Sequence, residues 1–173
     1  NDYLVAFEKN FAGIFTFTAD VPEGTKVEFW PGERLLGGHV RLDYGTIYDT
    51  YTGNGEEGQS YTPKFAYHGF SYLEIKGLET VTADMIKGYA VHCDNEEVGT
   101  LDTSFDGVNK MHQMIKNSIG DNMYNVFTDC PHREKLGWLE ETQLMYSSVA
   151  YNFDIASFSR KISTDMMDAQ KSN

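Results

Sequence analysis

The sequence predicts an α+β protein whose strands and helices are segregated along the chain: an antiparallel β-sandwich comes first and helices follow it. The evidence is a change of pattern near Thr100. Before it, short apolar or aromatic runs alternate with turn residues, and after it apolar residues recur every three or four positions. The 173 residues are 40% hydrophobic, which is enough for a core. We therefore expect one domain at residues 1–101 and another at 102–173.

Seven runs in the first part predict strands. In Tyr3-Leu4-Val5-Ala6-Phe7 the larger side chains alternate, as in a strand with one buried face. Turn residues such as Pro22-Glu23-Gly24 and Gly37-Gly38 separate the runs, and many short strands with frequent turns favour a sandwich. The predicted strands are residues 3–7, 13–18, 27–29, 40–42, 65–67, 72–75 and 89–91.

Three helices are predicted in the second part. The second runs from about Trp138 to Ala150, and apolar spacing places the third around residues 155–166. Such apolar faces need partners, so the helices either pack on themselves or on the sandwich, or belong to a piece of a longer helical domain. The first helix has one apolar face formed by Phe105, Val108, Met111, His112, Ile115 and Ile119.

Composition narrows the classes of function. Fourteen Lys and Arg against 26 Asp and Glu give a formal net charge of −12, which disfavours nucleic acids and anionic membranes as partners. Two cysteines are too few for a disulfide framework, and the five histidines lack metal-ligand spacing, so no metal site is expected. No apolar run is long enough to span a bilayer, and no leader is expected from the N-terminal residues.

The densest group of reactive side chains lies between Asp129 and Glu141. Carboxylates held close together and shielded from water have their pKa values pushed apart, as glycosidic bond cleavage requires. The residues alone also allow a structural reading, in which Asp129 caps a helix and Glu134 pairs with Arg133 or Lys135. Trp138 suits either a sugar platform or core packing, and His132 could donate hydrogen bonds to hydroxyls or to the backbone.

The loop resembles a signature of the bacterial α-L-rhamnosidases of glycoside hydrolase family 78. That signature reads approximately D-C-P-Q-R-D-E-R-L-G-W-T-G-D-A-Q, and residues 129–143 read D-C-P-H-R-E-K-L-G-W-L-E-E-T-Q. Residues 61–75 resemble the family's P-x-F-x-Y-x-G-F-R-Y-V-E-V segment, and residues 32–35 its G-E-x-L turn. The resemblance implies the end of a β-sandwich domain followed by the first helices of an incomplete (α/α)6 barrel.

The resemblance also implies roles in removing terminal α-L-rhamnose with inversion at the anomeric carbon. Glu134 would be the general acid, and the general base would be a Glu beyond residue 173. Asp129 and Glu141 would bind sugar hydroxyls and keep the proton on Glu134 by their negative charge. The expected substrate-binding residues are Asp129, His132, Arg133, Trp138 and Glu141.

Three positions depart from the family pattern. His132 stands where many members have Gln, Lys135 follows Glu134 where many have an acid and then Arg, and Ser71 replaces an Arg. We expect an incomplete enzyme that needs the remainder of its polypeptide, binds a rhamnose-containing carbohydrate and uses no cofactor. The alternatives are a non-catalytic carbohydrate-binding sandwich with a helical extension and an (α/α)6 enzyme for another sugar. The sequence leaves the cellular compartment open.

Overall fold

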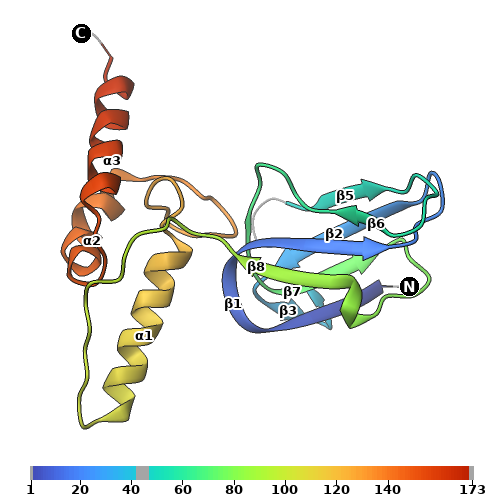
Figure 1. Ribbon diagram of the computed structural model, residues 1–173, viewed down its shortest axis with the longest axis horizontal. Coiled ribbons are helices and arrows are strands. Elements are labelled where there is room, and N and C mark those ends of the chain that lie inside the picture. Colours follow the sequence, from blue (N-terminus) through green and yellow to red (C-terminus); the bar gives the residue numbers. More distant parts are fainter. Residues whose placement is uncertain (1, 42–46, 172–173) are drawn as a thin grey trace. The chain divides into compact units, whose positions relative to one another are not determined.

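The computed structural model describes residues 2–41 and 47–171 (Figure 1). Contacts within the chain define two compact units. The first comprises residues 1–91 with 130–135, and the second comprises residues 92–129 with 136–173. Each unit is described by itself below. The predicted domain boundary at residue 101 stays a prediction, because compactness by contacts does not define a domain that folds alone.

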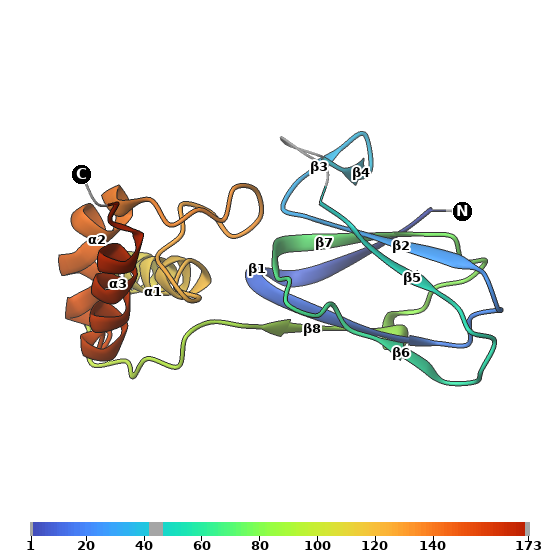
Figure 2. The same cartoon turned by 90° about the horizontal axis from the view of Figure 1, so that it is seen from above.

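The first unit is antiparallel β-structure (Figure 2). Five strands follow the order β5-β2-β7-β1-β6, and β8 also pairs with β1. A short hairpin of β3 and β4 lies beside them. The strands are β1 (Asp2–Ala19), β2 (Lys26–Gly32), β3 (Leu35–Leu36), β4 (His39–Val40), β5 (Asp49–Thr52), β6 (Gln59–Tyr61), β7 (His68–Lys76) and β8 (Ile86–Ala90).

One long strand joins the layers of this unit. The first part of β1 pairs with β7, its register shifts between Ala6 and Phe11, and its last part pairs with β6 and β8. Extra residues in one strand of a pair bend that strand, so a single strand can serve both layers. The side chains that fill the space between the layers are mostly aromatic or β-branched, and the largest fully buried ones are Phe15, Phe17, Phe29, Phe70, Leu73 and Ile75.

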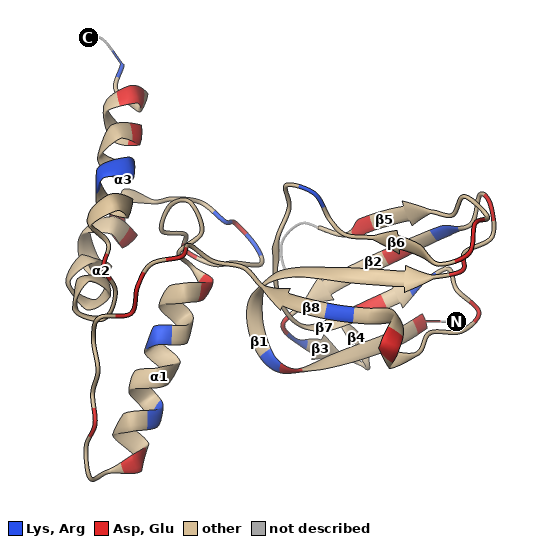
Figure 3. Ribbon diagram, in the orientation of Figure 1, with Lys and Arg blue, Asp and Glu red and all other residues tan. Residues whose placement is uncertain are grey.

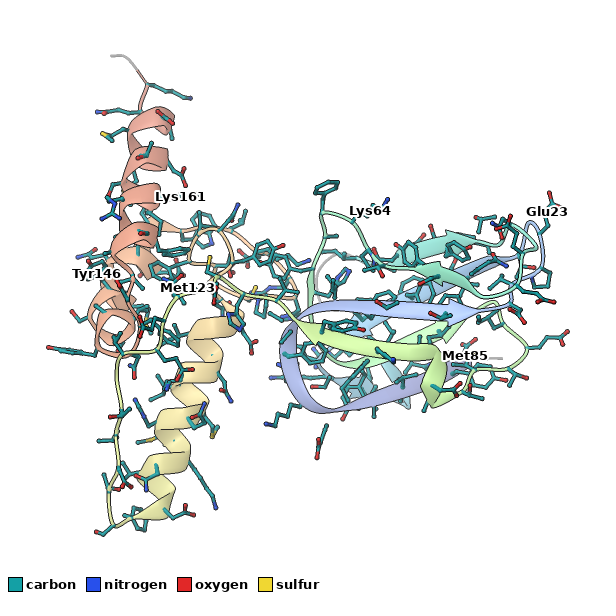
Figure 4. The ribbon with its side chains drawn as sticks, viewed as in Figure 1. Glu23, Lys64, Met85, Met123, Tyr146 and Lys161 are labelled. Atoms are coloured by element: carbon teal, nitrogen blue, oxygen red, sulfur yellow. The ribbon has the colours of Figure 1, made fainter. Side chains whose placement is uncertain are left out.

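The second unit contains three helices, α1 (Asp106–Asp121), α2 (Leu139–Asn152) and α3 (Ala156–Ala169). Met123, labelled in Figure 4, is 1% exposed and belongs to their shared core. Of the aliphatic residues on the predicted apolar face of the first helix, only Ile119 is buried. Met111 and Ile115 on the same face are exposed. The core residues of this unit are Ile119, Met123, Phe127, Val149, Phe153, Ile155, Phe158 and Ile162.

The predicted order of antiparallel strands followed by helices is confirmed. The predicted strand at residues 65–67 is wrong, because Phe65 has a φ of 59°, in the left-handed region that a strand excludes. The predicted runs at 3–7 and 13–18 belong to one strand, and Leu42 of the run at 40–42 lies outside the described residues. The short strands β3, β5 and β6 were not predicted.

Candidate active site

Hydrogen bonds between Asp129 and Leu136 close the base of the loop that carries Glu134. The backbone N–H of Asp129 donates to the carbonyl oxygen of Leu136 at 3.1 Å, and the N–H of Leu136 donates to Asp129 Oδ1 at 3.1 Å. Both residues belong to the second unit, and α2 begins three residues later. One carboxylate oxygen of Asp129 therefore has a structural contact, but it accepts from a loop residue and does not cap a helix as the structural reading predicted.

Between these anchors the chain makes a tight turn that ends in a left-handed residue. The Glu134 N–H donates to Cys130 Sγ at 3.3 Å, and Lys135 has a φ of 56°. A residue with a side chain rarely adopts this conformation, and surrounding contacts must hold it there. The backbone immediately after Glu134 is therefore constrained, which limits the directions in which the Glu134 carboxyl can point.

The side chain of Lys135 supplies such a constraint. Its ammonium donates to the carbonyl oxygen of Tyr67 and lies 5.0 Å from the centre of the Tyr67 ring. Burial lowers the pKa of Lys135 below its usual value, while the Asp49 carboxylate and Cys130 act in the opposite direction. Asp49 is itself held by His68, with 2.7 Å between His68 Nε2 and Asp49 Oδ2. A half-buried polar cluster thus anchors the turn within the first unit.

Gly69 provides the space for this anchoring. A Cβ atom built on Gly69 would lie 2.7 Å from Cγ of Pro131 and 3.1 Å from Cβ of His132, both closer than ordinary van der Waals contact. Pro131 is buried and His132 is half-buried. Because Gly69 has no side chain, the turn that contains Pro131 and His132 can pack closely against β7.

Arg133 and Glu134 form a pair at the tip of the loop. Arg133 Nη2 donates to Glu134 Oε1 at 3.0 Å, and the two side chains are 36% and 38% exposed. This is the contact that the structural reading predicted for Glu134, and it also presents a partly accessible carboxyl group beside a guanidinium. The geometry therefore allows both a structural and a chemical role.

Asp129 and Glu141 line one cavity of about 340 Å³ within the second unit. Most of its other walls are apolar, including Ile115, Met145 and Val149. Glu141 lies in the first turn of α2, where the helix dipole favours negative charge, and its buried Oε2 has no hydrogen-bond partner among the described residues. Two of the expected sugar-binding carboxylates thus come together in one concave site.

The remaining expected site residues lie in different surroundings. Trp138 is the N-cap of α2 and is 51% exposed, so core packing does not account for it in this structure. His132 Nδ1 lies 3.1 Å from Glu33 Oε2, close enough for an ion pair when the imidazole is protonated but poorly aligned for a hydrogen bond. His132 therefore contacts an acid rather than the backbone.

One group of side chains has the composition of a cation site. Ligand atoms of Asp2, His39 and Glu74 lie within 4.8 Å of one another. However, Lys76 Nζ is 3.1 Å from Glu74 Oε1 and 3.9 Å from Asp2 Oδ2. Because this ammonium lies beside the carboxylates and would repel a second cation, the group does not favour a metal ion. Across the described ranges, the helices are too short or too polar to cross a membrane.

The anchoring residues were not found by the sequence reasoning. Tyr67, His68 and Gly69 lie in the segment that resembled a family motif, but their contacts with the loop depend on residues more than 60 positions away. Lys135 was considered only as a departure from the signature and as a possible partner of Glu134, whereas the structure pairs Glu134 with Arg133 and Lys135 with Tyr67. No local pattern could have paired it with Tyr67.

Comparisons with known proteins agree on one family. Residues 1–92 match the family model described as the bacterial alpha-L-rhamnosidase concanavalin-like domain, and residues 96–173 match the bacterial alpha-L-rhamnosidase 6 hairpin glycosidase domain. An alpha-L-rhamnosidase of Formosa agariphila is 36% identical over 95% of this chain, and one of Streptomyces avermitilis is 29% identical over 99% of it.

Solved structures show the same relationship. The alpha-L-rhamnosidase from Dictyoglumus thermophilum has a TM-score of 0.89 and 33% identity over 99% of this chain, which corresponds to 20% of that protein. The Streptomyces avermitilis enzyme, solved as a complex with L-rhamnose, has a TM-score of 0.88 and 27% identity over 99% of this chain, 17% of its own. The chain spans 18% and 17% of the two curated relatives. The chain belongs to the bacterial α-L-rhamnosidase family, because its β-structured part and its helical part each match a model of that family.

Proposed function

We propose that this chain is part of an inverting α-L-rhamnosidase that removes terminal α-L-rhamnose from glycosides or polysaccharides. The observation that supports it is the loop at residues 129–141, in which Glu134 occupies a constrained turn with a partly exposed carboxyl group. Family membership supplies the class of reaction. The boundary at residue 101 would then separate a sandwich domain from a helical catalytic domain.

In the proposed mechanism Glu134 is the general acid. It would give its proton to the glycosidic oxygen as the bond to the anomeric carbon breaks, while a carboxylate elsewhere in the polypeptide activates water on the opposite face of the sugar. Negative charge near an acid favours its protonated form. Asp129 and Glu141 would supply that charge and would accept hydrogen bonds from sugar hydroxyls, and the second of these roles is supported by the cavity that they both line.

The other expected residues would bind the rhamnose. The Arg133 guanidinium and the His132 imidazole offer N–H donors to hydroxyl groups, and the exposed Trp138 indole offers a flat apolar face to the sugar ring. A further part of the same polypeptide would complete the site and supply the general base. No cofactor takes part in this scheme.

Replacement of Glu134 by Gln in the complete enzyme tests the assignment. Losing a general acid should lower kcat by about 10²- to 10⁴-fold on a rhamnoside with a poor leaving group, and much less on a dinitrophenyl rhamnoside whose leaving group needs no proton. Glu140→Gln is the matched control, because Glu140 is an exposed neighbour in the first turn of α2. Near-wild-type rates for Glu134→Gln on the poor leaving group would exclude the role.

A further inference from the structure

The backbone N–H of Glu134, the proposed general acid, has a side-chain acceptor. It donates to Cys130 Sγ at 3.3 Å, from the last residue of the turn back to the residue just before it. Neither residue lies in a helix or a strand, so neither takes part in the regular backbone hydrogen bonding of such elements. The thiol side chain therefore does what a main-chain carbonyl oxygen does in a helix.

The distance between the two atoms suits a sulfur acceptor. An N–H donor lies about 2.9–3.0 Å from an oxygen acceptor, whereas the Glu134 nitrogen is 3.3 Å from Cys130 Sγ. Because sulfur is the larger atom, this longer separation is a normal contact for it. A hydroxyl oxygen at residue 130 would fall short of its own optimum unless the turn closed further. The turn is therefore shaped to the size of the thiol.

Cys130 stands on the anchored side of this turn. It is half-buried, and the next residue, Pro131, is buried where a Cβ atom built on Gly69 would come within 2.7 Å of its Cγ. The Lys135 ammonium lies near enough for Cys130 to oppose the lowering of its pKa by burial. The sulfur is thus held by its surroundings and can serve as a fixed point for the Glu134 backbone.

The residues around the Glu134 amide are charged. Figure 3 shows basic and acidic residues side by side along the loop before α2. Arg133 Nη2 donates to Glu134 Oε1 at 3.0 Å. A carboxylate at residue 130 could accept the same N–H, but it would also compete with Glu134 for the guanidinium. A thiol sulfur is a weak acceptor, so it holds the backbone without drawing this cation away from the acid.

The backbone of Glu134 is therefore fixed on both sides. Its own N–H is bound to Cys130, and the next residue, Lys135, is held in a left-handed conformation with a φ of 56°. With the backbone fixed, the side-chain torsions of Glu134 alone aim its carboxyl group. We propose that Cys130 is a positioning residue for the general acid, which acts through its sulfur on the Glu134 backbone and does not touch the substrate. This inference rests on the proposed function.

Two substitutions in the complete enzyme separate the acceptor from its volume. Cys130→Ser keeps an acceptor at this position, whereas Cys130→Val fills a similar volume without one. On a rhamnoside with a poor leaving group, Cys130→Val should lower kcat about 10-fold, because a small displacement of a reacting group is costly. Cys130→Ser should lower kcat less. KM should stay within about twofold of wild type for both variants, since the sulfur does not contact the substrate.

The dependence on leaving group distinguishes positioning from a general loss of structure. Both variants should cleave a dinitrophenyl rhamnoside at near-wild-type rates, because that leaving group needs no proton. Cys93→Val is the matched control, since Cys93 is the other half-buried cysteine and lies outside the loop. It should leave the ratio of the two rates unchanged. The inference is overturned if Cys130→Val loses rate equally on both substrates, keeps the wild-type rate on the poor leaving group, or outperforms Cys130→Ser.

Hydrogen exchange tests the contact in the wild-type enzyme, independently of the catalytic role. The Glu134 amide should exchange at least about 10-fold more slowly than in an unstructured peptide, and faster in Cys130→Val than in wild type. Mass spectrometry with fragmentation to single residues measures both rates. Exchange at the unstructured rate overturns the inference. Slow exchange combined with near-wild-type rates for Glu134→Gln would instead refute the proposed acid and leave the contact standing. Circular dichroism melting curves show whether each variant is folded.

Discussion

Lys135 and Tyr67 lie 68 positions apart in the chain, yet the Lys135 ammonium donates to the Tyr67 carbonyl oxygen and lies 5.0 Å from the centre of its ring. This contact anchors the residue that follows Glu134 to the loop before β7. A displacement of about 1 Å at a reacting group can cost on the order of 100-fold in rate. The contact between Lys135 and Tyr67 therefore helps to position Glu134, the proposed general acid.

Replacing Lys135 by Met should lower kcat of the complete enzyme about 10- to 100-fold, because the turn loses its polar contact while keeping most of its apolar volume. Steady-state kinetics on an aryl α-L-rhamnoside measures the effect. Lys64→Met is the control, since Lys64 is exposed in the same segment as Tyr67. Unchanged kinetics for Lys135→Met would show that the loop is positioned by other contacts.

A methyl group introduced at Gly69 should clash with the same loop, on the side where the loop packs against β7. The new Cβ would lie 2.7 Å from Pro131 Cγ, so Gly69→Ala should destabilise the folded state by about 1–3 kcal/mol and lower kcat. Thermal melting and kinetics measure both effects. Gly120→Ala has open space around its Cβ within α1 and should be neutral or stabilising by about 0.5–1 kcal/mol. Equal behaviour of the two variants would contradict the steric argument.

Glu74 should make the hairpin of β3 and β4 sensitive to acid. Burial alone would raise the pKa of Glu74, but hydrogen bonds from His39, Val40 N–H and Lys76 lower it below the ordinary 4.5. A lowered pKa contributes stability above about pH 4.5, and this contribution is lost as the pH falls through the folded-state value.

The wild-type protein should therefore melt at a higher temperature than Glu74→Gln at pH 7, and the difference should shrink below pH 4.5. Melting curves of both proteins between pH 3 and pH 7 provide the measurement. A difference that is constant over this range would show that ionisation of Glu74 does not stabilise the fold.

The 173-residue chain alone should release no aryl group from an α-L-rhamnoside, because the proposed general base lies elsewhere in the polypeptide. Incubation at high protein concentration with a sensitive fluorogenic rhamnoside checks this. The complete enzyme is the positive control. Turnover by the short chain would require a base within residues 1–173 and would change the proposed division of roles.

Local pattern was sufficient for some elements and not for others. Alternation of larger and smaller side chains identified the partly buried face of the first part of β1, and apolar spacing placed the ends of α2 within about two residues and those of α3 within about three residues of the observed ones. It failed at residues 65–67, whose aromatic run resembles a strand although Phe65 is fully exposed in a left-handed conformation. Whether such a segment forms a strand depends on its pairing partners and loop contacts, which lie too far along the chain to appear in a short stretch of sequence.

The sequence by itself determined the class of the fold, the family resemblance and the carboxylates to consider, because these depend on residue type and spacing along one stretch of chain. Only the tertiary structure decided what surrounds them. It placed Asp129 and Glu141 on one cavity, anchored Lys135 to Tyr67 and packed Gly69 against Pro131. The physical reason is that burial and charge balance depend on neighbours in space, and here those neighbours lie as far as 68 residues apart.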